Sequence, residues 1–312
     1  MYQSRRAFLA GAGVTMAAAG LSGCRTAGGA ADSKSPAKKH PFQIGMARIT
    51  LMKKGYPKTL EILQSLDCRE LGLMENTISY DASQEEIAAF KANAAKFGVE
   101  IVTAGPLGFS KMEEVEPFFR FARNFGLKSV SVVPFEWHPK IRDVADNEAR
   151  KKILPPSEWR LESDCALDML EECVKKYGVK AAIHNHGPDL KGCYPTAEAA
   201  LARIGNRDRR IGVCLDVGHE WRGGGDPVEF IRRHGDRVVE VHIKNLLFDR
   251  EKKYIPVTAS RGDLDIRGIF AALLDAGFRG PCLMECERYC NDEMSLAESI
   301  GYYRGIMDAL DF

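Results

Sequence analysis

From Phe42 onward, short apolar runs alternate with longer segments that are apolar on one face only. The short runs have the length and composition of buried strands, and the longer ones repeat apolar residues at the helical period. The pattern predicts eight strands, at Gln43–Ile49, Cys68–Leu73, Glu100–Thr103, Ser129–Val133, Lys180–His184, Ile211–Asp216, Val238–Ile243 and Pro281–Glu285. It predicts eight helices between and after them, at Pro57–Ser65, Gln84–Phe97, Met112–Phe125, Pro156–Tyr177, Thr196–Ile204, Pro227–His234, Ile266–Ala276 and Met294–Ala309.

Strands and helices alternate strictly in this prediction. Such alternation implies parallel strands joined by helical crossovers, and eight units close a (β/α)8 barrel. We therefore predict an α/β protein, a TIM barrel formed as a single domain by residues 42–312. The competing architecture is an open doubly wound sheet, which normally carries a Gly-rich phosphate loop after its first strand; Met46–Thr50 has none. Two long loops, Pro134–Pro155 and Lys244–Asp265, are expected beside the active site.

The first 41 residues differ in composition from the rest. Ser4-Arg5-Arg6-Ala7-Phe8-Leu9 has the form of a twin-arginine signal, and Leu21-Ser22-Gly23-Cys24 resembles a bacterial lipobox. We expect residues 1–24 to be a twin-arginine, lipoprotein-type signal peptide and residues 25–41 to be a flexible tether. The protein would then be exported to the periplasm and held at the membrane only through a lipid on Cys24. The alternative is a fortuitous arginine pair ahead of an Ala-rich helix.

Charge and cysteine content narrow the class of protein. The 312 residues include 44 Lys and Arg against 43 Asp and Glu, which argues against a nucleic-acid partner or a membrane surface bound through bulk charge. Eight cysteines follow Cys24, and an even number in an exported chain allows disulfides. However, Cys68, Cys214 and Cys282 lie in apolar, strand-like runs, where a free thiol behaves as a small hydrophobe. We expect reduced buried thiols and leave any pairing open.

Polar side chains gather where predicted strands five to eight end. They are His184 and His186, Asp216 and His219, His242 and Lys244, and Glu285, so that four of the seven histidines of the chain lie there. The carboxyl ends of barrel strands converge on one pocket. Imidazole and carboxylate together suit Mn²⁺, Zn²⁺, Co²⁺ or Fe²⁺, whereas Mg²⁺ prefers oxygen ligands. We therefore expect a divalent metal ion bound by His184, Asp216, His242 and Glu285.

Each of these residues also has a purely structural explanation. Asp216 could cap a helix that starts after its strand, and Glu285 could pair with Arg288 at the surface. Lys244 could be a solvated charge. One histidine of the pair His184 and His186 could be a hydrogen-bonded core residue.

The motifs Leu215-Asp216-Val217-Gly218-His219, Val241-His242-Ile243-Lys244 and Met284-Glu285 resemble those of the xylose-isomerase-like sugar phosphate isomerase/epimerase family. This family includes ketose 3-epimerases, inosose dehydratases and metal-dependent apurinic endonucleases, and the resemblance covers roughly residues 42–312. It implies metal-ligand positions for Asp216, His242 and Glu285. It also implies a substrate contact for His219, while Lys244 follows the family's His-x-Lys pattern. A small carbohydrate is the implied partner, and a homo-oligomer is compatible with the family.

Two positions depart from the family pattern. His184 stands where the epimerases have a glutamate that is both ligand and acid/base, and Asn245 stands where the family usually has Asp. A neutral imidazole still binds metal, but the proton exchange between two carboxylates that an epimerase uses loses one partner. The sequence predicts a divalent-metal-dependent isomerase or epimerase acting on a non-phosphorylated keto-sugar through an enediolate. A 3-keto-sugar lyase or hydratase, and a non-catalytic sugar-binding barrel, are the alternatives.

Roles for individual residues follow from this chemistry. Glu285 is expected to bind metal and also to move protons, with His186 or His219 assisting. Lys244 is expected to stabilise an oxyanion and, with His219, to contact substrate. Glu70 could reach substrate from the second strand, or it could be a buried structural acid.

Overall fold

The computed structural model describes residues 40–310, apart from residues 76, 249–253 and 287–289. The predicted signal peptide, Cys24 and nearly all of the predicted tether lie outside the described residues, so these expectations stay predictions. Within the described ranges, no helix is both long enough and apolar enough to span a membrane.

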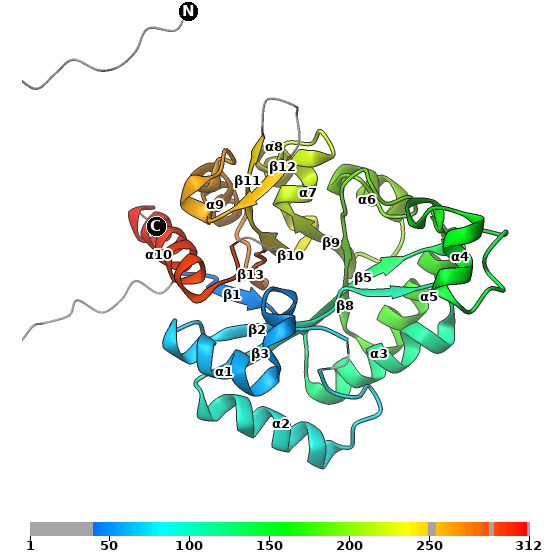
Figure 1. Ribbon diagram of the computed structural model, residues 1–312, viewed down its shortest axis with the longest axis horizontal. Coiled ribbons are helices and arrows are strands. Elements are labelled where there is room, and N and C mark those ends of the chain that lie inside the picture. The colour runs from blue at the N-terminus through cyan, green and yellow to red at the C-terminus, as the bar shows by residue number, and fades with distance from the viewer. Residues whose placement is uncertain (1–39, 76, 249–253, 287–289, 311–312) are drawn as a thin grey trace, which may run out of the picture. The chain divides into compact units, whose positions relative to one another are not determined.

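Nine parallel strands form a nearly closed barrel, with helices around its outside (Figure 1). The strands are β1 (Ile44–Ala47), β2 (Glu70–Leu73), β3 (Glu100–Ala104), β4 (Leu107–Phe109), β5 (Ser129–Pro134), β8 (Lys180–His184), β9 (Ile211–Asp216), β10 (Val238–Ile243) and β13 (Cys282–Met284). Their spatial order is β3-β2-β1-β13-β10-β9-β8-β5-β4. The predicted TIM barrel is confirmed.

The ninth strand arises because the third predicted strand is broken in two. β3 and β4 are the two edges of the sheet, and only Gly105 and Pro106 separate them in the chain. Gly105 has a φ of 119°, and a Cβ atom there would lie 2.2 Å from the Ser131 carbonyl oxygen. Glycine is therefore required at this close approach. The Thr103 hydroxyl oxygen lies 3.2 Å from the Ser129 carbonyl oxygen, so β3 and β5 approach each other closely across the break.

Eight helices cover the barrel at the positions that the sequence pattern predicts. They are α1 (Tyr56–Ser65), α2 (Gln84–Lys96), α3 (Met112–Phe125), α5 (Asp164–Tyr177), α6 (Ala197–Ile204), α8 (Pro227–His234), α9 (Ile266–Asp275) and α10 (Glu293–Ala309). One boundary was wrong: the helix predicted from Pro156 begins at Asp164. The Ser163 side chain accepts from the Ala166 N–H and caps the helix there. Upstream, β7 (Arg160–Leu161) pairs with another short strand instead.

The segments predicted as long loops contain short elements of their own. The first holds β6 (Glu136–Trp137), which pairs with β7, and α4 (Asn147–Ile153). The second holds an antiparallel hairpin of β11 (Asn245–Phe248) and β12 (Tyr254–Val257). A short helix, α7 (Val217–Arg222), follows β9 directly, and a 3-10 helix, η1 (Arg48–Lys54), follows β1. Three further 3-10 turns lie at Pro156–Glu158, Gly235–Arg237 and Ala259–Arg261.

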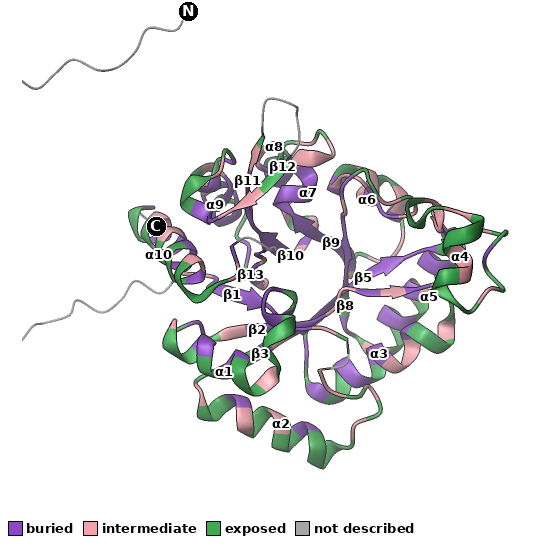
Figure 2. Cartoon of the chain, in the orientation of Figure 1, coloured by how far each residue is buried: buried purple, intermediate pink, exposed green. Residues whose placement is uncertain are grey.

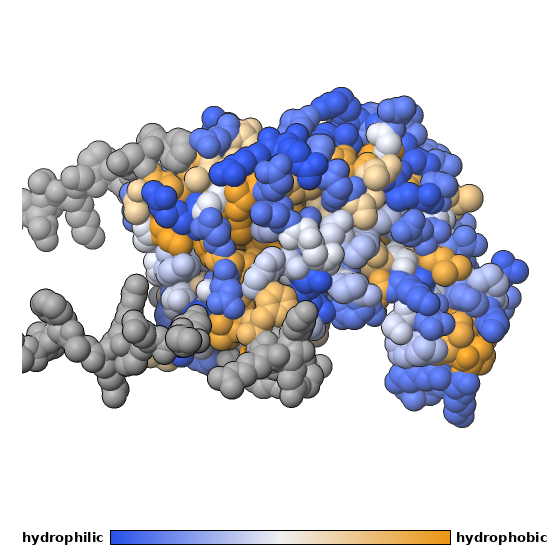
Figure 3. Space-filling model, turned by 90° about the horizontal axis from the view of Figure 1, so that it is seen from above, coloured by the Kyte–Doolittle hydropathy of each residue, from blue (hydrophilic) through white to orange (hydrophobic). Residues whose placement is uncertain are grey.

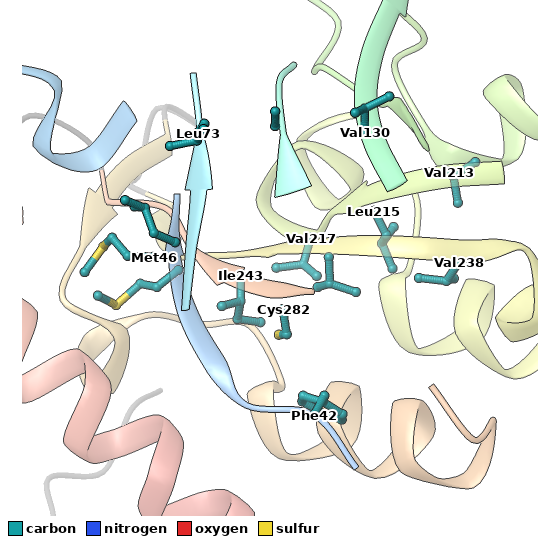
Figure 4. Packing of buried hydrophobic residues seen from close by; sticks show 14 of the residues in the cluster. Phe42, Met46, Leu73, Val130, Val213, Leu215, Val217, Val238, Ile243 and Cys282 are labelled. Carbon is teal, nitrogen blue, oxygen red and sulfur yellow. The ribbon is translucent and has the colours of Figure 1, made fainter. Parts of the chain in front are cut away.

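The strands are buried on both faces (Figure 2), but the two faces differ in chemistry. Alternate residues such as Val213, Leu215 and Ile243 belong to the apolar cluster that the strands share with the surrounding helices (Figure 4). The residues between them on these strands, such as Gly212, Cys214 and His242, are small or polar. The outer face of the protein seen in Figure 3 is largely hydrophilic, with smaller apolar patches. All eight cysteines of the described residues are free, and all but Cys165 are buried.

Candidate metal centre and active site

The four predicted metal ligands lie together at the carboxyl end of the barrel. His184 and Asp216 are the last residues of β8 and β9, His242 is near the end of β10, and Glu285 directly follows β13. Each offers one ligand atom, and these four atoms all lie within 4.8 Å of one another. His184 Nε2 is 3.5 Å from Asp216 Oδ2, and His242 Nδ1 is 2.9 Å from Glu285 Oε2. We call these four residues the metal cluster.

The hydrogen bonding of His184 fits a metal ligand. Its side chain is buried, with 4% exposed, and neither ring nitrogen has a hydrogen-bond partner among the residues that the structure describes. Buried polar atoms are nearly always hydrogen-bonded, so this imidazole needs another partner. A divalent cation between His184, Asp216 and Glu285 supplies one, and the mixed nitrogen and oxygen donors suit Mn²⁺, Zn²⁺, Co²⁺ or Fe²⁺. The donor set fits the expected metal ion but does not identify it.

Asp216 serves both the cluster and the local fold. Its Oδ1 atom accepts from the His219 N–H (2.8 Å) and caps α7, which is the structural explanation considered for this residue. Its Oδ2 atom faces His184 and the Lys244 ammonium, 2.9 Å away. Burial alone would raise the pKa of Asp216, but nearby His219, Lys244 and His184 hold it well below its ordinary value. The carboxylate is therefore charged, as a metal ligand must be.

Lys244 is not the solvated charge that it could have been. The residue is 4% exposed, and its Nζ atom lies 2.9 Å from Asp216 Oδ2 and 2.7 Å from Glu285 Oε1. The pKa of Glu285 is lowered despite its burial, chiefly because of Lys244 and a hydrogen bond to His242. Lys244 thus bridges the two carboxylates of the cluster.

The rings of His186 and His219 pack against each other, tilted, beside the cluster. Their ring centroids are 4.0 Å apart, at an interplanar angle of 31°. Burial lowers the pKa of His186 to about 4 and that of His219 to about 2, so both rings are neutral near neutral pH. Arg222 Nη1 lies 2.9 Å from His219 Nδ1. Because a guanidinium can only donate, we assign the ring hydrogen of His219 to Nε2.

The hairpin β11–β12 lies against α7 at the edge of this pair. The Arg222 guanidinium lies over the Tyr254 ring, 3.5 Å from its centroid, and also donates to Asp189 (2.8 Å). Trp221 packs against Phe248, with ring centroids 4.3 Å apart. The second long loop therefore holds Arg222, and through it His219, in place.

Glu70 does not lie at this site. It is the first residue of β2 and pairs in register with Glu100, the first residue of β3, at the amino end of the barrel. The strand ends three residues later, at Leu73, on the side of the metal cluster. Burial raises the pKa of Glu70 to about 7, in keeping with the alternative of a buried structural acid. The structure does not bring Glu70 to the metal cluster, and this position favours the structural alternative over the expected substrate contact.

Three polar residues of the site were not predicted from the sequence. Asn185, directly after β8, and Glu220, on α7, are hydrogen-bonded to each other: the Asn185 amide donates to Glu220 Oε2 (3.2 Å), which also accepts from the N–H of Ala197 at the start of α6 (2.6 Å). Glu240 lies one layer below His242 on β10. Only Glu240 had a signal in the sequence, because a residue two positions before His242 on a strand shares its face.

Cys214 lies below Asp216 on β9 and provides a second set of donors. The ligand atoms of His184, Cys214 and His242 also lie within 4.8 Å of one another. Burial raises the pKa of the Cys214 thiol to about 12, so it is protonated unless a metal ion displaces the proton.

Comparisons with known proteins agree with this fold and identify the family. The model of the xylose isomerase-like TIM barrel family matches residues 63–306, and the chain belongs to that family. An inosose dehydratase of Geobacillus kaustophilus is 26% identical over 281 residues, covering 80% of this chain and 88% of the relative. These matches bear out the expected class, an enzyme of the sugar isomerase, epimerase or lyase type.

Two solved structures share the fold at low sequence identity. A mannonate dehydratase from Streptococcus suis superposes with a TM-score of 0.62 and 16% identity, covering 86% of this chain and 95% of that one. The IolI protein, whose structure contains a bound zinc atom, superposes with a TM-score of 0.60 and 17% identity, covering 85% and 96%.

Proposed function

We propose that the protein is a divalent-metal-dependent lyase that removes water from a non-phosphorylated keto-sugar or a related keto-polyol. The observation that carries the proposal is His184 in the metal cluster, at the strand position where the resemblance places the second catalytic glutamate of the epimerases. Epimerisation needs a proton acceptor and donor on opposite faces of the substrate. Elimination needs one base beside the carbonyl and a donor for the departing oxygen, so the loss of one carboxylate affects it less.

The residues around the cluster suit this chemistry. A divalent ion bound there would act as a Lewis acid on the carbonyl oxygen of the substrate. Glu285, a charged carboxylate, takes the proton from the carbon next to the carbonyl, and Lys244 stabilises the negative charge that develops on oxygen. The C–O bond of the neighbouring hydroxyl then breaks and a C=C bond forms. The removed proton leaves with the hydroxyl as water, while neutral His186 and His219 bind the departing oxygen.

Two further observations support the choice of substrate and reaction. Helix α7 starts beside the cluster, but Asp216 caps its N-terminus and leaves no positive helix end for a phosphate group. The relative from G. kaustophilus is named an inosose dehydratase, and the fold is shared with a mannonate dehydratase. We therefore favour dehydration of a non-phosphorylated substrate over isomerisation, which shares the first proton transfer and is the second candidate.

The decisive experiment is turnover in D₂O. The protein is supplied with Mn²⁺, Co²⁺ or Zn²⁺ and with keto-inositols or 3-keto-sugars, and the products are analysed by mass spectrometry and ultraviolet absorption. We expect loss of water and an absorbing enone. Deuterium incorporation without loss of water would show an isomerase instead. Binding without turnover, unchanged by added metal, would show a sugar-binding barrel, and equal turnover of phosphorylated substrates would refute the substrate class.

Location forms a separate part of the proposal. The twin-arginine signature and the lipobox support an exported, lipid-anchored protein in the periplasm, with the barrel reaching solution on a short tether. Metabolic labelling with a palmitate analogue tests this: we expect labelled full-length protein, and no label in Cys24→Ser. Label-free, cytoplasmic protein would refute the location without affecting the proposed reaction.

A further inference from the structure

The carboxylate of Glu240 is buried at the centre of the barrel. Glu240 is 0% exposed, and both of its carboxylate oxygens have partners. Oε1 lies 3.0 Å from His242 Nε2, and Oε2 accepts from the Thr103 hydroxyl at 2.8 Å. Thr103 belongs to β3, which is not a neighbour of β10 in the sheet, so this hydrogen bond crosses the interior. Glu240 is therefore held from two sides, directly below the metal cluster.

The ring of His242 has two environments. Nδ1 points to the cluster, 2.9 Å from Glu285 Oε2, and Nε2 points down to Glu240. A histidine that binds metal through one nitrogen usually donates the hydrogen of the other to a carboxylate or carbonyl group, which sets the tautomer and makes the ligand a better electron donor. The geometry at His242 matches this arrangement, with Nδ1 as the ligand atom and Nε2 as the donor.

The free-energy cost of burying the Glu240 carboxylate indicates that this residue does more than fill space in the barrel. Burying a carboxylate is costly unless it is paired and hydrogen-bonded, and an apolar side chain would fill the same layer without that cost. Thr103 and His242 compensate for the burial only while His242 keeps a hydrogen on Nε2. A residue that merely closed the barrel would not need this charge.

We propose that Glu240 is a positioning residue, which holds His242 with its hydrogen on Nε2 and thereby strengthens metal binding by Nδ1. A residue inside the barrel would then raise the metal affinity of the cluster at its carboxyl end. This inference rests on the proposed metal-dependent function, and it adds a residue that acts on the metal only through His242.

Metal affinity of full-length protein, first stripped with a chelator, provides the test. Titration calorimetry with Mn²⁺ and with Zn²⁺ is carried out on wild type, Glu240→Gln and Thr103→Val. Gln keeps the size and an acceptor oxygen but removes the charge, and we expect the dissociation constant to rise about 10- to 100-fold. Thr103→Val removes the other partner of Glu240 and keeps the charge, so we expect a change of less than about 3-fold.

A purely structural role predicts lower stability of Glu240→Gln with no change in its metal affinity. Equal metal affinity of Glu240→Gln and wild type, with only a lower melting temperature, would overturn the proposal and leave the proposed function intact. Failure of the wild type to bind either metal would overturn both. Should Glu240→Gln not fold, long-range ¹H–¹⁵N correlation of the imidazoles in zinc-loaded wild type decides: a hydrogen on Nε2 of His242 supports the proposal, and zinc on Nε2 overturns it.

Discussion

The side chain of Asn185 forms two hydrogen bonds with the backbone of Asp216. Its Oδ1 atom accepts from the Asp216 N–H (2.8 Å), and its Nδ2 atom donates to the Asp216 carbonyl (3.2 Å). The pair joins the carboxyl ends of two neighbouring strands where each contributes a residue to the metal cluster. Asn185 thereby fixes the spacing of His184 and Asp216 without contacting the metal position.

Replacement of Asn185 by Ala should loosen both strand ends. The change removes these two hydrogen bonds and the one to Glu220, and it leaves buried groups without partners, so we expect a loss of about 2 to 3 kcal/mol in the free energy of unfolding. Metal affinity should fall as well. Urea denaturation measures the first effect and calorimetry the second. Asn147→Ala, at an exposed position on α4, is the control and should change neither.

Asp216→Asn separates the two roles of Asp216. Asn keeps an oxygen that can cap α7 at the His219 N–H but lacks the charge that a cation requires. We expect a folded protein with an unchanged circular dichroism spectrum and metal affinity lowered at least about 100-fold, a loss of about 3 kcal/mol in binding free energy. Asp216→Ala and His242→Ala should lose the metal entirely. Full metal occupancy in both alanine variants would contradict the site.

His184→Glu tests whether this residue sets the type of reaction. The change restores the carboxylate that the epimerases have on this strand, and with it a second group able to exchange protons. We expect deuterium exchange or epimerisation to rise while the loss of water falls, both followed in one assay by mass spectrometry. His184→Gln, which offers an oxygen ligand without a base, is the matched control. Equal product ratios in His184→Glu, His184→Gln and wild type would show that this residue does not set the type of reaction.

Glu220 should give the protein a pH-dependent stability. Burial raises its pKa to about 7 in the folded protein, against about 4.3 for an exposed Glu. The folded state therefore holds a proton that the unfolded state has lost, and stability falls as pH rises from about 4.5 to 7. Glu220→Gln should remove most of this slope, on the order of 3 kcal/mol across the window. Unfolding by urea at several pH values measures it; parallel curves for the two proteins would contradict the assignment.

Gly105→Ala should destabilise the break in the third strand. The φ of 119° and the approach to the Ser131 carbonyl leave no room for a methyl group, so we expect a loss of about 3 kcal/mol or more. Gly98→Ala is the matched control. Gly98 also has a positive φ, 71°, but nothing lies within 4 Å of its Cβ position, so only the cost of the left-handed conformation, about 1 to 2 kcal/mol, should be lost. Melting temperatures give the comparison directly.

The fold could be predicted because its signals are local. Apolar alternation placed β8, β9 and β10 at their observed bounds. The start of α5 was missed because Ser163 competes as a cap with an apolar pattern that continues upstream. The break at Gly105 and the pairing of β6 with β7 depend on contacts between distant segments, which periodicity does not report.

The part of the site that could be predicted is the part formed by residues at the ends of strands. His184, Asp216, His242 and Glu285 could be grouped because parallel strands end on one side of a barrel. Glu70 was misplaced because the residue lies at the start of its strand, and the pattern gives no indication of which residues of a run face the pocket. Asn185 was passed over because it acts through the backbone of Asp216, a contact that no motif encodes.

Lys244 affects the stability of the protein when no metal ion is bound. Two carboxylates in a closed interior would repel each other and favour unfolding, but the ammonium between Asp216 and Glu285 neutralises that repulsion. The chain thus carries its own counter-ion. We therefore expect the barrel to fold without the metal ion and to bind the ion afterwards.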